Sequence, residues 1–531
     1  MKNLLSCLSF FMATSFVLVS CGEAKETRTA KKKHPNIIYI LADDLGYGDI
    51  SAFNARGKIR TPHIDKLTNE GMKFTDAHSP SAVCTPTRYG IMTGRYSWRS
   101  PLKEGVLTGK SKALIPNHRT TVASLLKRAG YETAFIGKWH LGWDWAQKDT
   151  TDFGDEGWNP TDFENLDFTK PVANTPNDLG FDYAYGHSGS LDMPPYAYVE
   201  NGNLTAAVDH VTEDKEKYSW WRKGPTAADF RHEDVTPHFF RKAIDYLRDK
   251  SKGEQPFFMY LALPSPHTPI LPTEEWQGKS GLNPYADFVL MVDDYVGKVL
   301  AEIEMQGLTK NTIVVFTSDN GCSPEANFEV LSAKDHHPSA MYRGHKADIY
   351  EGGHRVPFSI RWPDRVQPGT VSEKTICHTD LMATLADIVA YDLKDNEGED
   401  SFSLLPILLN SQDQKFTREA TVHHSINGSF AIRKEGFKLI LCPGSGGWSF
   451  PRPGTDDING LPTFQLYDLE KDPGEAHNLY EQMPDKAIEL AELMKHYIKN
   501  GRSTPGVPQQ NDEEAYGDKV WEQVKIFDLE N

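Results

Sequence analysis

Four apolar runs along the chain each end abruptly in polar residues. They are Asn36–Ala42, Thr133–Gly137, Pro256–Leu263 and Thr312–Ser318. Within each run the apolar residues follow one another without polar alternation, which is typical of strands buried on both faces, as in a parallel sheet. Apolar stretches with helical spacing lie between them, at 121–129 and 288–303, and a glycine follows each as a stop signal. This succession of strands and helices predicts an α/β fold.

The pattern changes after about residue 415. Shorter apolar runs at 430–433, 437–441 and 464–468 precede a helical stretch at 486–498. We expect a large mixed, mostly parallel sheet sandwiched by helices over residues 35–415. A smaller α+β subdomain, with an antiparallel sheet and one packed helix, is expected over residues 416–531. The stretch 143–218 is rich in Trp, Asp, Asn, Gly and Pro, which predicts long loops over the active face.

The first 20 residues have the pattern of a secretory signal peptide, with Lys2 followed by an apolar run. The tetrapeptide Leu-Val-Ser-Cys at 18–21 is similar to a bacterial lipoprotein box, in which Cys21 becomes the lipidated first residue. An ordinary signal peptide cut nearby is the alternative. Residues 21–34 are polar and suit a tether. We therefore expect an exported bacterial protein, in the periplasm or at the outer-membrane surface, joined to the membrane only by a lipid anchor at Cys21.

The composition narrows the class of protein. With 531 residues, 39% hydrophobic and 25% charged, the chain is globular rather than disordered or fibrous. The 57 Lys and Arg against 74 Asp and Glu give a net charge of −17, which disfavours a nucleic-acid partner. The 6 cysteines are too sparse for a disulfide framework. These values indicate an acidic enzyme or binding protein.

Polar residues follow the strand runs at their carboxyl ends, where α/β sheets bind ligands. Asp43 and Asp44 follow the first run, and Asp319 and Asn320 follow the last. Adjacent carboxylates repel one another, and a hard cation such as Ca²⁺ relieves that repulsion. Two solvated charges are the ordinary alternative for the first pair, and an Asn-Gly hairpin turn is the ordinary alternative for the second.

His140 and His267 follow the two other runs. A single loop histidine is usually a surface residue, but two at one sheet edge, with Lys138 and Lys346 in neighbouring motifs, indicate an anion site with acid–base groups. Between residues 85 and 140 Lys and Arg outnumber the acidic residues. This excess predicts a basic basin that would concentrate anions.

Cys84 opens the most specific segment, Cys84–Gly94. Pro86 favours a helix start, where backbone N–H groups attract an anion, although a buried cysteine before a helix is the ordinary alternative. The pattern C-x-P-x-R followed by T-G resembles the signature of the type I sulfatases of the alkaline-phosphatase-like superfamily, in which the cysteine becomes formylglycine. Similar family motifs follow in order: ADDLGYGD at 42–49, GKWHLG at 137–142, PSPHTP at 264–269, SDNG at 318–321 and GHKADIYEGG at 344–353. Thr87 departs from the Ser or Ala that is more frequent there, which bears on how a maturation enzyme reads the segment.

The resemblance implies hydrolysis of sulfate esters with one Ca²⁺ and formylglycine as cofactors. The implied calcium ligands are Asp43, Asp44, Asp319, Asn320 and the modified Cys84. Cys84, as a hydrated formylglycine, would attack sulfur with Asp319 as base, while Arg88 orients the hydrate.

The resemblance also implies roles for the basic residues of the site. Lys138, His267 and Lys346 would hold the sulfate, and His267 with Lys346 would protonate the departing alcohol. His140 would take the proton from the second hydroxyl, so that sulfate leaves and the aldehyde returns.

The resemblance to bacterial lipoprotein sulfatases points to sulfated saccharides of glycosaminoglycan, mucin or algal type as substrates. It also implies a formylglycine-generating or anaerobic sulfatase-maturating enzyme as a partner. Two alternatives remain open. One is a phosphomonoester or phosphodiester hydrolase on the same scaffold, although such relatives usually place Asp-His where this chain has Asp319-Asn320. The other is a non-catalytic glycan-binding lipoprotein. Candidate sugar contacts are Arg99, Asp182, His187, Asp192 and His424.

Overall fold

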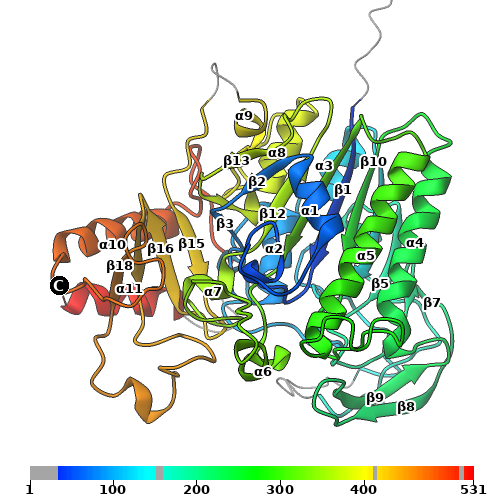
Figure 1. The fold of residues 1–531 in the computed structure, drawn as a ribbon, viewed down its shortest axis with the longest axis horizontal. Helices are drawn as coiled ribbons and strands as arrows, with labels where there is room; N and C mark the ends of the chain where they lie inside the picture. The colour runs from blue at the N-terminus through cyan, green and yellow to red at the C-terminus, as the bar shows by residue number, and fades with distance from the viewer. Residues whose placement is uncertain (1–33, 151–159, 411–414, 513–518, 531) are drawn as a thin grey trace, which may run out of the picture. The chain divides into compact units, whose positions relative to one another are not determined.

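The computed structural model describes residues 34–150, 160–410, 415–512 and 519–530. A ten-stranded mixed sheet runs through these described residues (Figure 1). The central strands run parallel to one another, and antiparallel neighbours extend the sheet on both sides. In spatial order the strands are β13 (Thr370–Ser372), β2 (Met72–Phe74), β12 (Phe358–Arg361), β11 (Thr312–Ser318), β1 (Asn36–Ala42), β10 (Phe257–Ala262), β4 (Glu132–Lys138), β5 (Tyr183–His187), β6 (Val199–Glu200) and β7 (Asn203–Leu204).

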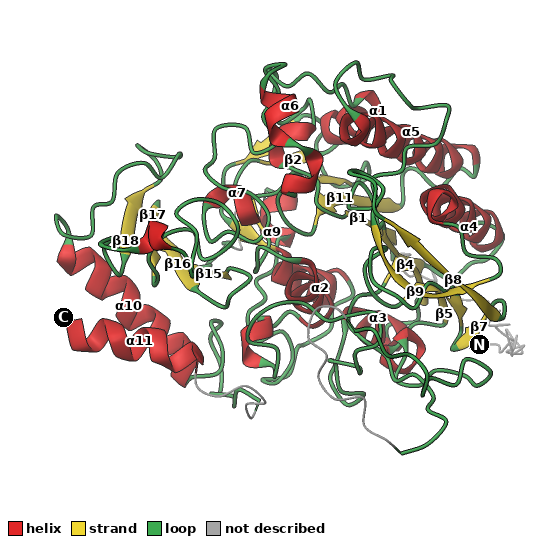
Figure 2. Ribbon diagram, turned by 90° about the horizontal axis from the view of Figure 1, so that it is seen from below, coloured by secondary structure: helices red, strands yellow, loops and turns green. Residues whose placement is uncertain are grey.

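Helices cover both faces of this sheet, as Figure 2 shows. Along β1, Ile38 and Ile40 enter the core on one face, whereas Ile37 and Tyr39 enter the core on the other. The first core is covered by α1 (Pro62–Asn69), α4 (Val235–Lys250) and α5 (Pro284–Met305), and the second by α2 (Cys84–Thr93), α3 (Val122–Arg128) and α8 (Leu381–Ile388). A strand buried on both faces must be apolar throughout, which explains the unbroken runs in the sequence and confirms the expected sandwich.

A smaller antiparallel sheet follows, with an adjoining helix pair (Figure 1, at the left). Its strands, in order, are β15 (Thr421–His424), β16 (Phe430–Lys434), β17 (Phe437–Ile440) and β18 (Gln465–Asp468). The helices are α10 (Pro484–Lys499), which packs on the sheet, and α11 (Lys519–Glu530), which was not predicted. The described residues from His34 onward form one compact unit, and the boundary near residue 415 stays a prediction.

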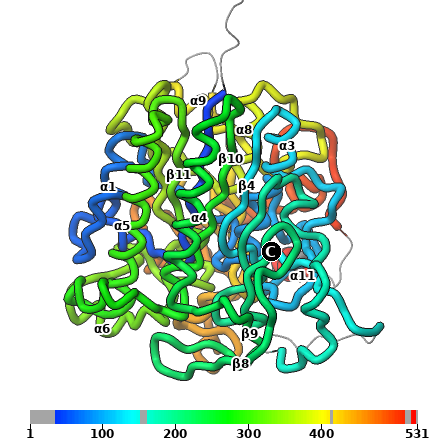
Figure 3. The backbone as a smooth tube through the Cα atoms, turned by 90° about the vertical axis from the view of Figure 1, so that its right-hand side faces the viewer, coloured from blue at the N-terminus to red at the C-terminus, as the bar shows by residue number. Residues whose placement is uncertain are grey.

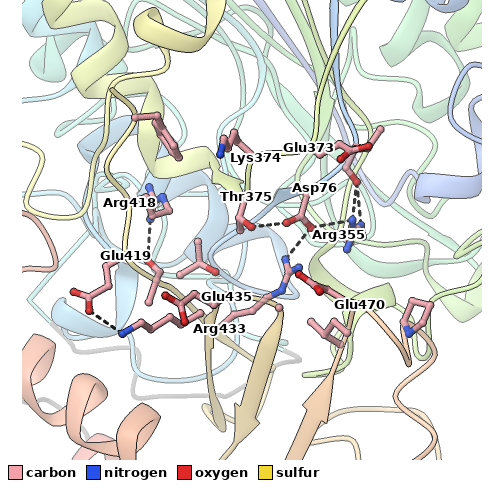
Figure 4. A pocket seen from close by; sticks show the side chains of 18 of the residues that line it. Asp76, Arg355, Glu373, Lys374, Thr375, Arg418, Glu419, Arg433, Glu435 and Glu470 are labelled. Carbon is pink, nitrogen blue, oxygen red and sulfur yellow. Dashed lines mark hydrogen bonds and ion pairs between the residues drawn. The ribbon is translucent and has the colours of Figure 1, made fainter. Parts of the chain in front are cut away.

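Buried ion pairs join the small sheet to the main body (Figure 4). Arg433 on β16 and Arg355 both bind Asp76, through nitrogen–oxygen distances of 2.9 and 2.8 Å. Thr375 donates a further hydrogen bond to the same carboxylate over 2.5 Å. One buried carboxylate with this many donors fixes the two parts against each other, because moving either would leave a charge unpaired.

The region 143–218 differs from its prediction as loops, because it carries β5, β6, β7 and the whole of β8 (Val208–Asp214). Short Tyr- and Ala-containing strands give a weaker signal than long aliphatic runs. The remaining strands and α-helices of the described residues are β3 (Ala77–His78) and β14 (Ile376–Cys377), the hairpin of β8 (Val208–Asp214) and β9 (Trp221–Ala227), and the short helices α6 (Phe328–Ser332), α7 (Glu351–His354) and α9 (Leu405–Leu408).

The predicted signal peptide, tether and lipidated Cys21 lie at positions outside the described residues. Within the described ranges, no helix combines the length and apolarity needed to cross a membrane. Four cysteines in the described part of the chain, Cys84, Cys322, Cys377 and Cys442, are buried free thiols.

The carboxyl ends of β1, β4, β10 and β11 lie at one edge of the large sheet. The β8–β9 hairpin and α6 lie at the same edge, at the bottom of Figures 1 and 3. This edge is where the polar motifs of the sequence come together.

Candidate active site

Two adjacent strands bring the four acidic and amide side chains together. Ala42 at the end of β1 pairs with Ser318 at the end of β11, so the next residues of each strand are neighbours. The backbone N–H of Asp44 donates to Asp319 Oδ1 over 3.2 Å, and Asn320 Nδ2 donates to Asp44 Oδ1 over 2.7 Å. All of these side chains, and that of Asp43, are buried. Asp44 has a φ of 61°, a left-handed backbone conformation that is uncommon for aspartate and recurs at functional sites.

Each buried carboxylate is paired with a cationic side chain. The pairs hold one oxygen of each carboxylate and leave the second oxygen for other partners. They are Lys138 Nζ with Asp43 Oδ2 at 2.5 Å, Lys346 Nζ with Asp44 Oδ2 at 2.7 Å, and Arg88 Nη2 with Asp319 Oδ2 at 2.8 Å.

The carboxylates of the site differ in their proton affinity. Burial by itself would raise the pKa of Asp43, but Lys138 and His267 outweigh it and hold that pKa well below its usual value. Burial, together with the negative charge of Asp43, raises the pKa of Asp319 to about 7. A bound divalent cation would lower the pKa of Asp319, because it favours the ionised form.

The donor atoms suit a hard cation. One ligand atom from each of Asp43, Asp44, Cys84 and His267 lies within 4.8 Å of the others. The side-chain oxygen of Asn320 is buried and has no hydrogen-bond partner among the described residues. Carboxylate and amide oxygens are the ligands that Ca²⁺ prefers, so the residues present fit that ion.

Cys84 is the first residue of α2, as predicted, and is 2% exposed. Its Sγ lies 3.7 Å from Asp43 Oδ1. Burial raises the pKa of the thiol, so an unmodified Cys84 is a poor source of thiolate. One turn later on the same helix, Arg88 donates to the backbone oxygen of Lys138 over 2.9 Å and also to Asp319. Arg88 therefore ties the cysteine helix to two strand ends.

The two histidines differ in their contacts. His140 has a φ of 53°, its Nε2 lies 2.8 Å from the backbone oxygen of Leu107, and its Nδ1 is buried without a partner in the described structure. Burial and Lys138 lower the pKa of His140 well below its usual value, so the ring is neutral and can accept a proton. His267 lies with Nε2 3.6 Å from Asp44 Oδ2.

Ser190 is a site residue that the sequence did not reveal. Its hydroxyl accepts a hydrogen bond from Lys138 Nζ over 3.0 Å and lies 3.3 Å from the ring nitrogens of His267. The only available signal was its place in the loop after β5, at the carboxyl edge of the sheet. A serine in a loop is too common for that position to single it out.

A cavity of about 240 Å³ opens in front of Cys84. Its floor includes His140, His267 and Lys346. Its walls come from several separate parts of the chain, which include the loop after β5, the β8–β9 hairpin, the segment after β11 and the loop between β17 and β18. Residues of the walls include Ser190, Asp192, Trp220, Arg222, Glu325 and Trp448.

Asp192 is the sugar-contact candidate that lines this cavity. His187 ends β5 beside Lys138 but is buried against Phe239, with ring centroids 5.7 Å apart, and does not reach the cavity wall.

The other candidate sugar contacts, Arg99, Asp182 and His424, do not line this cavity. Arg99 is fully buried and binds both carboxylate oxygens of Asp400, at 2.8 and 2.9 Å. Asp182 lies at the amino end of β5, away from the site edge. His424 is buried, with its Nε2 3.1 Å from the hydroxyl of Ser97.

Asp182 pairs with Lys127, one of the basic residues between 85 and 140, at 2.7 Å. Arg95 and Arg119 likewise bind acidic residues from distant parts of the chain. Arg88 and Lys138 are the members of the basin that reach the candidate site.

A second, larger cavity of about 590 Å³ lies at the junction drawn in Figure 4. Several of its charged groups are already paired, as with Asp76 above and with Lys434 and Glu419 at 3.1 Å. Behind it, ring nitrogens of His78 and His354 lie 3.0 Å apart, but Lys438 Nζ lies 3.0 Å from His354. Fixed cations beside these histidines disfavour a metal ion there.

Comparison with known proteins agrees with the site geometry. The family model "Sulfatase" matches residues 35–391, and "N-sulphoglucosamine sulphohydrolase, C-terminal" matches residues 344–503. The chain is 33% identical to N-acetylgalactosamine-6-O-sulfatase of Bacteroides thetaiotaomicron, over 90% of this chain and 96% of the relative. It is 30% identical to human arylsulfatase A, over 88% and 87% of the two chains. A solved structure from a study of glycosaminoglycan metabolism by Bacteroides thetaiotaomicron superposes with a TM-score of 0.74 at 31% identity, covering 87% of this chain and 99% of the other.

Replacing Arg99 by alanine should reduce stability rather than change substrate choice. The variant leaves the Asp400 carboxylate buried without its partner, which costs about 3–5 kcal/mol. Urea denaturation would measure the free energy of unfolding. The double variant Arg99→Ala, Asp400→Asn should recover much of the loss, because no uncompensated charge remains. A rise in KM with unchanged stability would instead restore Arg99 as a substrate contact.

Proposed function

The chain belongs to the sulfatase family and is a sulfuric ester hydrolase, and we propose that it removes O-sulfate groups from carbohydrates with a formylglycine formed at Cys84 and one Ca²⁺. The observation that carries the proposal is the position of Cys84, at the start of α2 and 3.7 Å from a carboxylate of an oxygen-rich, cation-suited cluster. Two relatives support the carbohydrate part of the proposal: the N-acetylgalactosamine-6-O-sulfatase, and the structure from glycosaminoglycan metabolism. Both span most of the chain.

The two absent groups would supply distinct chemistry. Ca²⁺ held by Asp43, Asp44, Asp319 and Asn320 would neutralise charge on a sulfate oxygen, and a hydrated aldehyde at position 84 would supply two hydroxyls, one of them nucleophilic. Asp319 lies among these groups with one carboxylate oxygen on Arg88. We assign to Asp319 both metal binding and removal of the proton from the attacking hydroxyl.

The basic side chains are assigned to sulfate binding and to proton transfer. Lys346 lines the cavity, and Lys138 Nζ lies 3.0 Å from the hydroxyl of the lining residue Ser190, so both would bring positive charge to the place where the sulfate would bind. His267 and Lys346 face the cavity and are assigned to protonate the leaving alcohol. His140, a neutral ring whose buried Nδ1 has no partner among the described residues, is assigned to accept the proton from the second hydroxyl.

We also propose export and lipid anchoring for this chain. The supporting observation is the signal-like segment that ends in Leu-Val-Ser-Cys at 18–21. Export would bring the enzyme to glycans outside the cytoplasm. A formylglycine-generating or anaerobic sulfatase-maturating enzyme would then have to act on Cys84 before export and folding, because the folded protein buries this residue.

Production with a suitable maturation enzyme should convert Cys84 to formylglycine. Peptide mass spectrometry would detect the aldehyde in place of the thiol, and sulfate release from sulfated mono- and disaccharides would measure activity. A Cys84→Ala variant, which cannot be converted, is the matched control. Full conversion in a folded sample without hydrolysis of any sulfate ester would disprove the proposed function.

Replacing Asp319 by alanine should reduce kcat by at least ~10³-fold, on the scale of losing a group that activates a nucleophile. The loss should exceed that of Asn320→Ala, which removes an oxygen ligand but no base. Steady-state kinetics over a calcium titration would separate the two effects. Recovery of Asp319→Ala activity in high calcium would show that Asp319 acts only as a ligand.

Replacing His140 by alanine should separate release of the alcohol from release of sulfate. Attack on sulfur does not need His140 under this assignment, so one equivalent of alcohol should appear in a single turnover. Sulfate should remain on the protein, where intact-mass measurement would detect it. His267→Ala is the comparison, because it should slow alcohol release itself. If His140→Ala also abolishes alcohol release and retains no sulfate, the roles of the two histidines must be exchanged.

A further inference from the structure

An ion pair on the cavity wall has no role in the chemistry assigned above. Asp192 lies in the loop after β5, two residues beyond Ser190, and its side chain is 5% exposed. Arg222, the second residue of β9, donates its backbone N–H to the backbone oxygen of Asp192 over 3.2 Å. The guanidinium of Arg222 also binds Oδ2 of the Asp192 side chain. Backbone and side-chain contacts therefore fix Asp192 from two directions.

The Asp192 carboxylate retains unused hydrogen-bonding capacity. Its Oδ1 is buried and has no hydrogen-bond partner within the described part of the chain. Burial by itself would raise the pKa of Asp192, but His267 and Arg222 outweigh it and lower that pKa, so the group is a carboxylate at neutral pH. A buried carboxylate oxygen that accepts no hydrogen bond is unfavourable. A ligand hydroxyl that reached Oδ1 would supply the missing hydrogen bond.

The surroundings of the pair combine aromatic and polar groups. Trp220 precedes Arg222 on the hairpin, and the guanidinium lies 5.3 Å from the centre of its ring. The indole N–H of Trp220 donates to Glu325 over 3.1 Å. Trp448 also lines the cavity and lies with its ring 6.0 Å from Lys346 Nζ. Aromatic faces suit the C–H surface of a sugar ring, and charged groups suit its hydroxyls.

The size of the cavity limits the ligand. At about 240 Å³ it is smaller than the roughly 300–1,000 Å³ that holds a drug-sized molecule. One sulfated sugar residue therefore suits it better than several residues of a glycan chain. The sulfate would lie on the Cys84 side, which directs the hydroxyls of the same ring toward the Asp192 wall.

We propose that Asp192, held in place by Arg222, is a sugar-binding residue that accepts hydrogen bonds from hydroxyls of the sugar ring that carries the sulfate. The inference rests on the proposed carbohydrate function and deepens it, because it names a residue that distinguishes sugar sulfates from other sulfate esters. An aryl sulfate has no ring hydroxyl to donate. It gains nothing from Asp192 in either the ground state or the transition state.

The test compares two classes of substrate on matured full-length enzyme. The sugar substrate is the best one among O-sulfated N-acetylgalactosamine, N-acetylglucosamine and galactose, and the aryl substrate is para-nitrophenyl sulfate. Asp192→Ala should lower kcat/KM for the sugar sulfate about 10- to 100-fold, the loss expected for a hydrogen bond to a charged group. For the aryl sulfate, kcat/KM should change less than about 3-fold. Asp209→Ala, which removes an exposed carboxylate from the same hairpin, should change neither value.

Retained aryl sulfate turnover shows that the variant is folded and matured, so a selective loss on the sugar supports the inference. Equal losses on both substrates would overturn it, because Asp192 would then act through His267 or the sulfate site. Unchanged kcat/KM for the sugar sulfate would overturn it as well.

In a second measurement, Arg222→Met and the double variant should lose no more kcat/KM for the sugar sulfate than Asp192→Ala alone, since the two residues act as one unit. A wild-type enzyme that hydrolyses the aryl sulfate but none of the sugars would refute the carbohydrate function itself.

Discussion

The repulsion between buried carboxylates at the ends of β1 and β11 is the constraint on which the site depends. Asp43, Asp44 and Asp319 would be unstable together in a low-dielectric interior if they stood alone. Lys138, Lys346 and Arg88 each neutralise one of them, and each comes from a different motif of the sequence. Burial and the negative charge of Asp43 nevertheless raise the pKa of Asp319 to about 7. A bound divalent cation would act in the opposite direction, because it favours the ionised carboxylate.

The need to assemble these charges explains several features of the surrounding chain. The motif at 344–353 must pass close to the end of β11 so that Lys346 can reach Asp44. Gly321 permits this approach, since a Cβ there would lie 1.9 Å from the backbone oxygen of Gly352. Arg88 reaches Asp319 because it lies one helical turn after Cys84. One short helix, α2, therefore positions both Cys84 and Arg88, whose positive charge neutralises Asp319.

The elements that depend on local sequence pattern could be predicted from the sequence. The four apolar runs became strands of the large sheet, the stretch at 288–303 lies within α5, and the predicted antiparallel sheet formed with α10. The catalytic and metal-binding residues that the sequence indicated meet at one sheet edge, because each motif directly follows a strand or opens a helix there. Their chemical roles stay predictions.

Contacts between side chains that lie far apart in the sequence could not be predicted from local pattern. The partner of Arg99 is Asp400, about 300 residues later in the chain. Nothing in the sequence around Arg99 therefore distinguishes a buried, paired arginine from one that is available to bind substrate. Asp182 directly precedes β5, yet whether it lies at the site edge depends on strand direction in a region that was not predicted as sheet. Ser190, Trp220, Arg222 and Trp448 lie in loops or on a hairpin, where no periodic pattern marks them.

The residues assigned to chemistry and those assigned to substrate recognition consequently lie in different parts of the structure. The groups that would act on the sulfate lie at strand ends and on α2, where both faces of the sheet are packed and small displacements are costly. The walls that would contact a sugar come from the loop after β5, which carries Asp192, from the β8–β9 hairpin and from the β17–β18 loop of the small subdomain. Loops tolerate substitution and insertion far better than buried strands. The small subdomain therefore does more than complete the core, because its loop contributes Trp448 to the cavity. A change in that loop could alter which sugar fits without disturbing the balance of charge around Cys84.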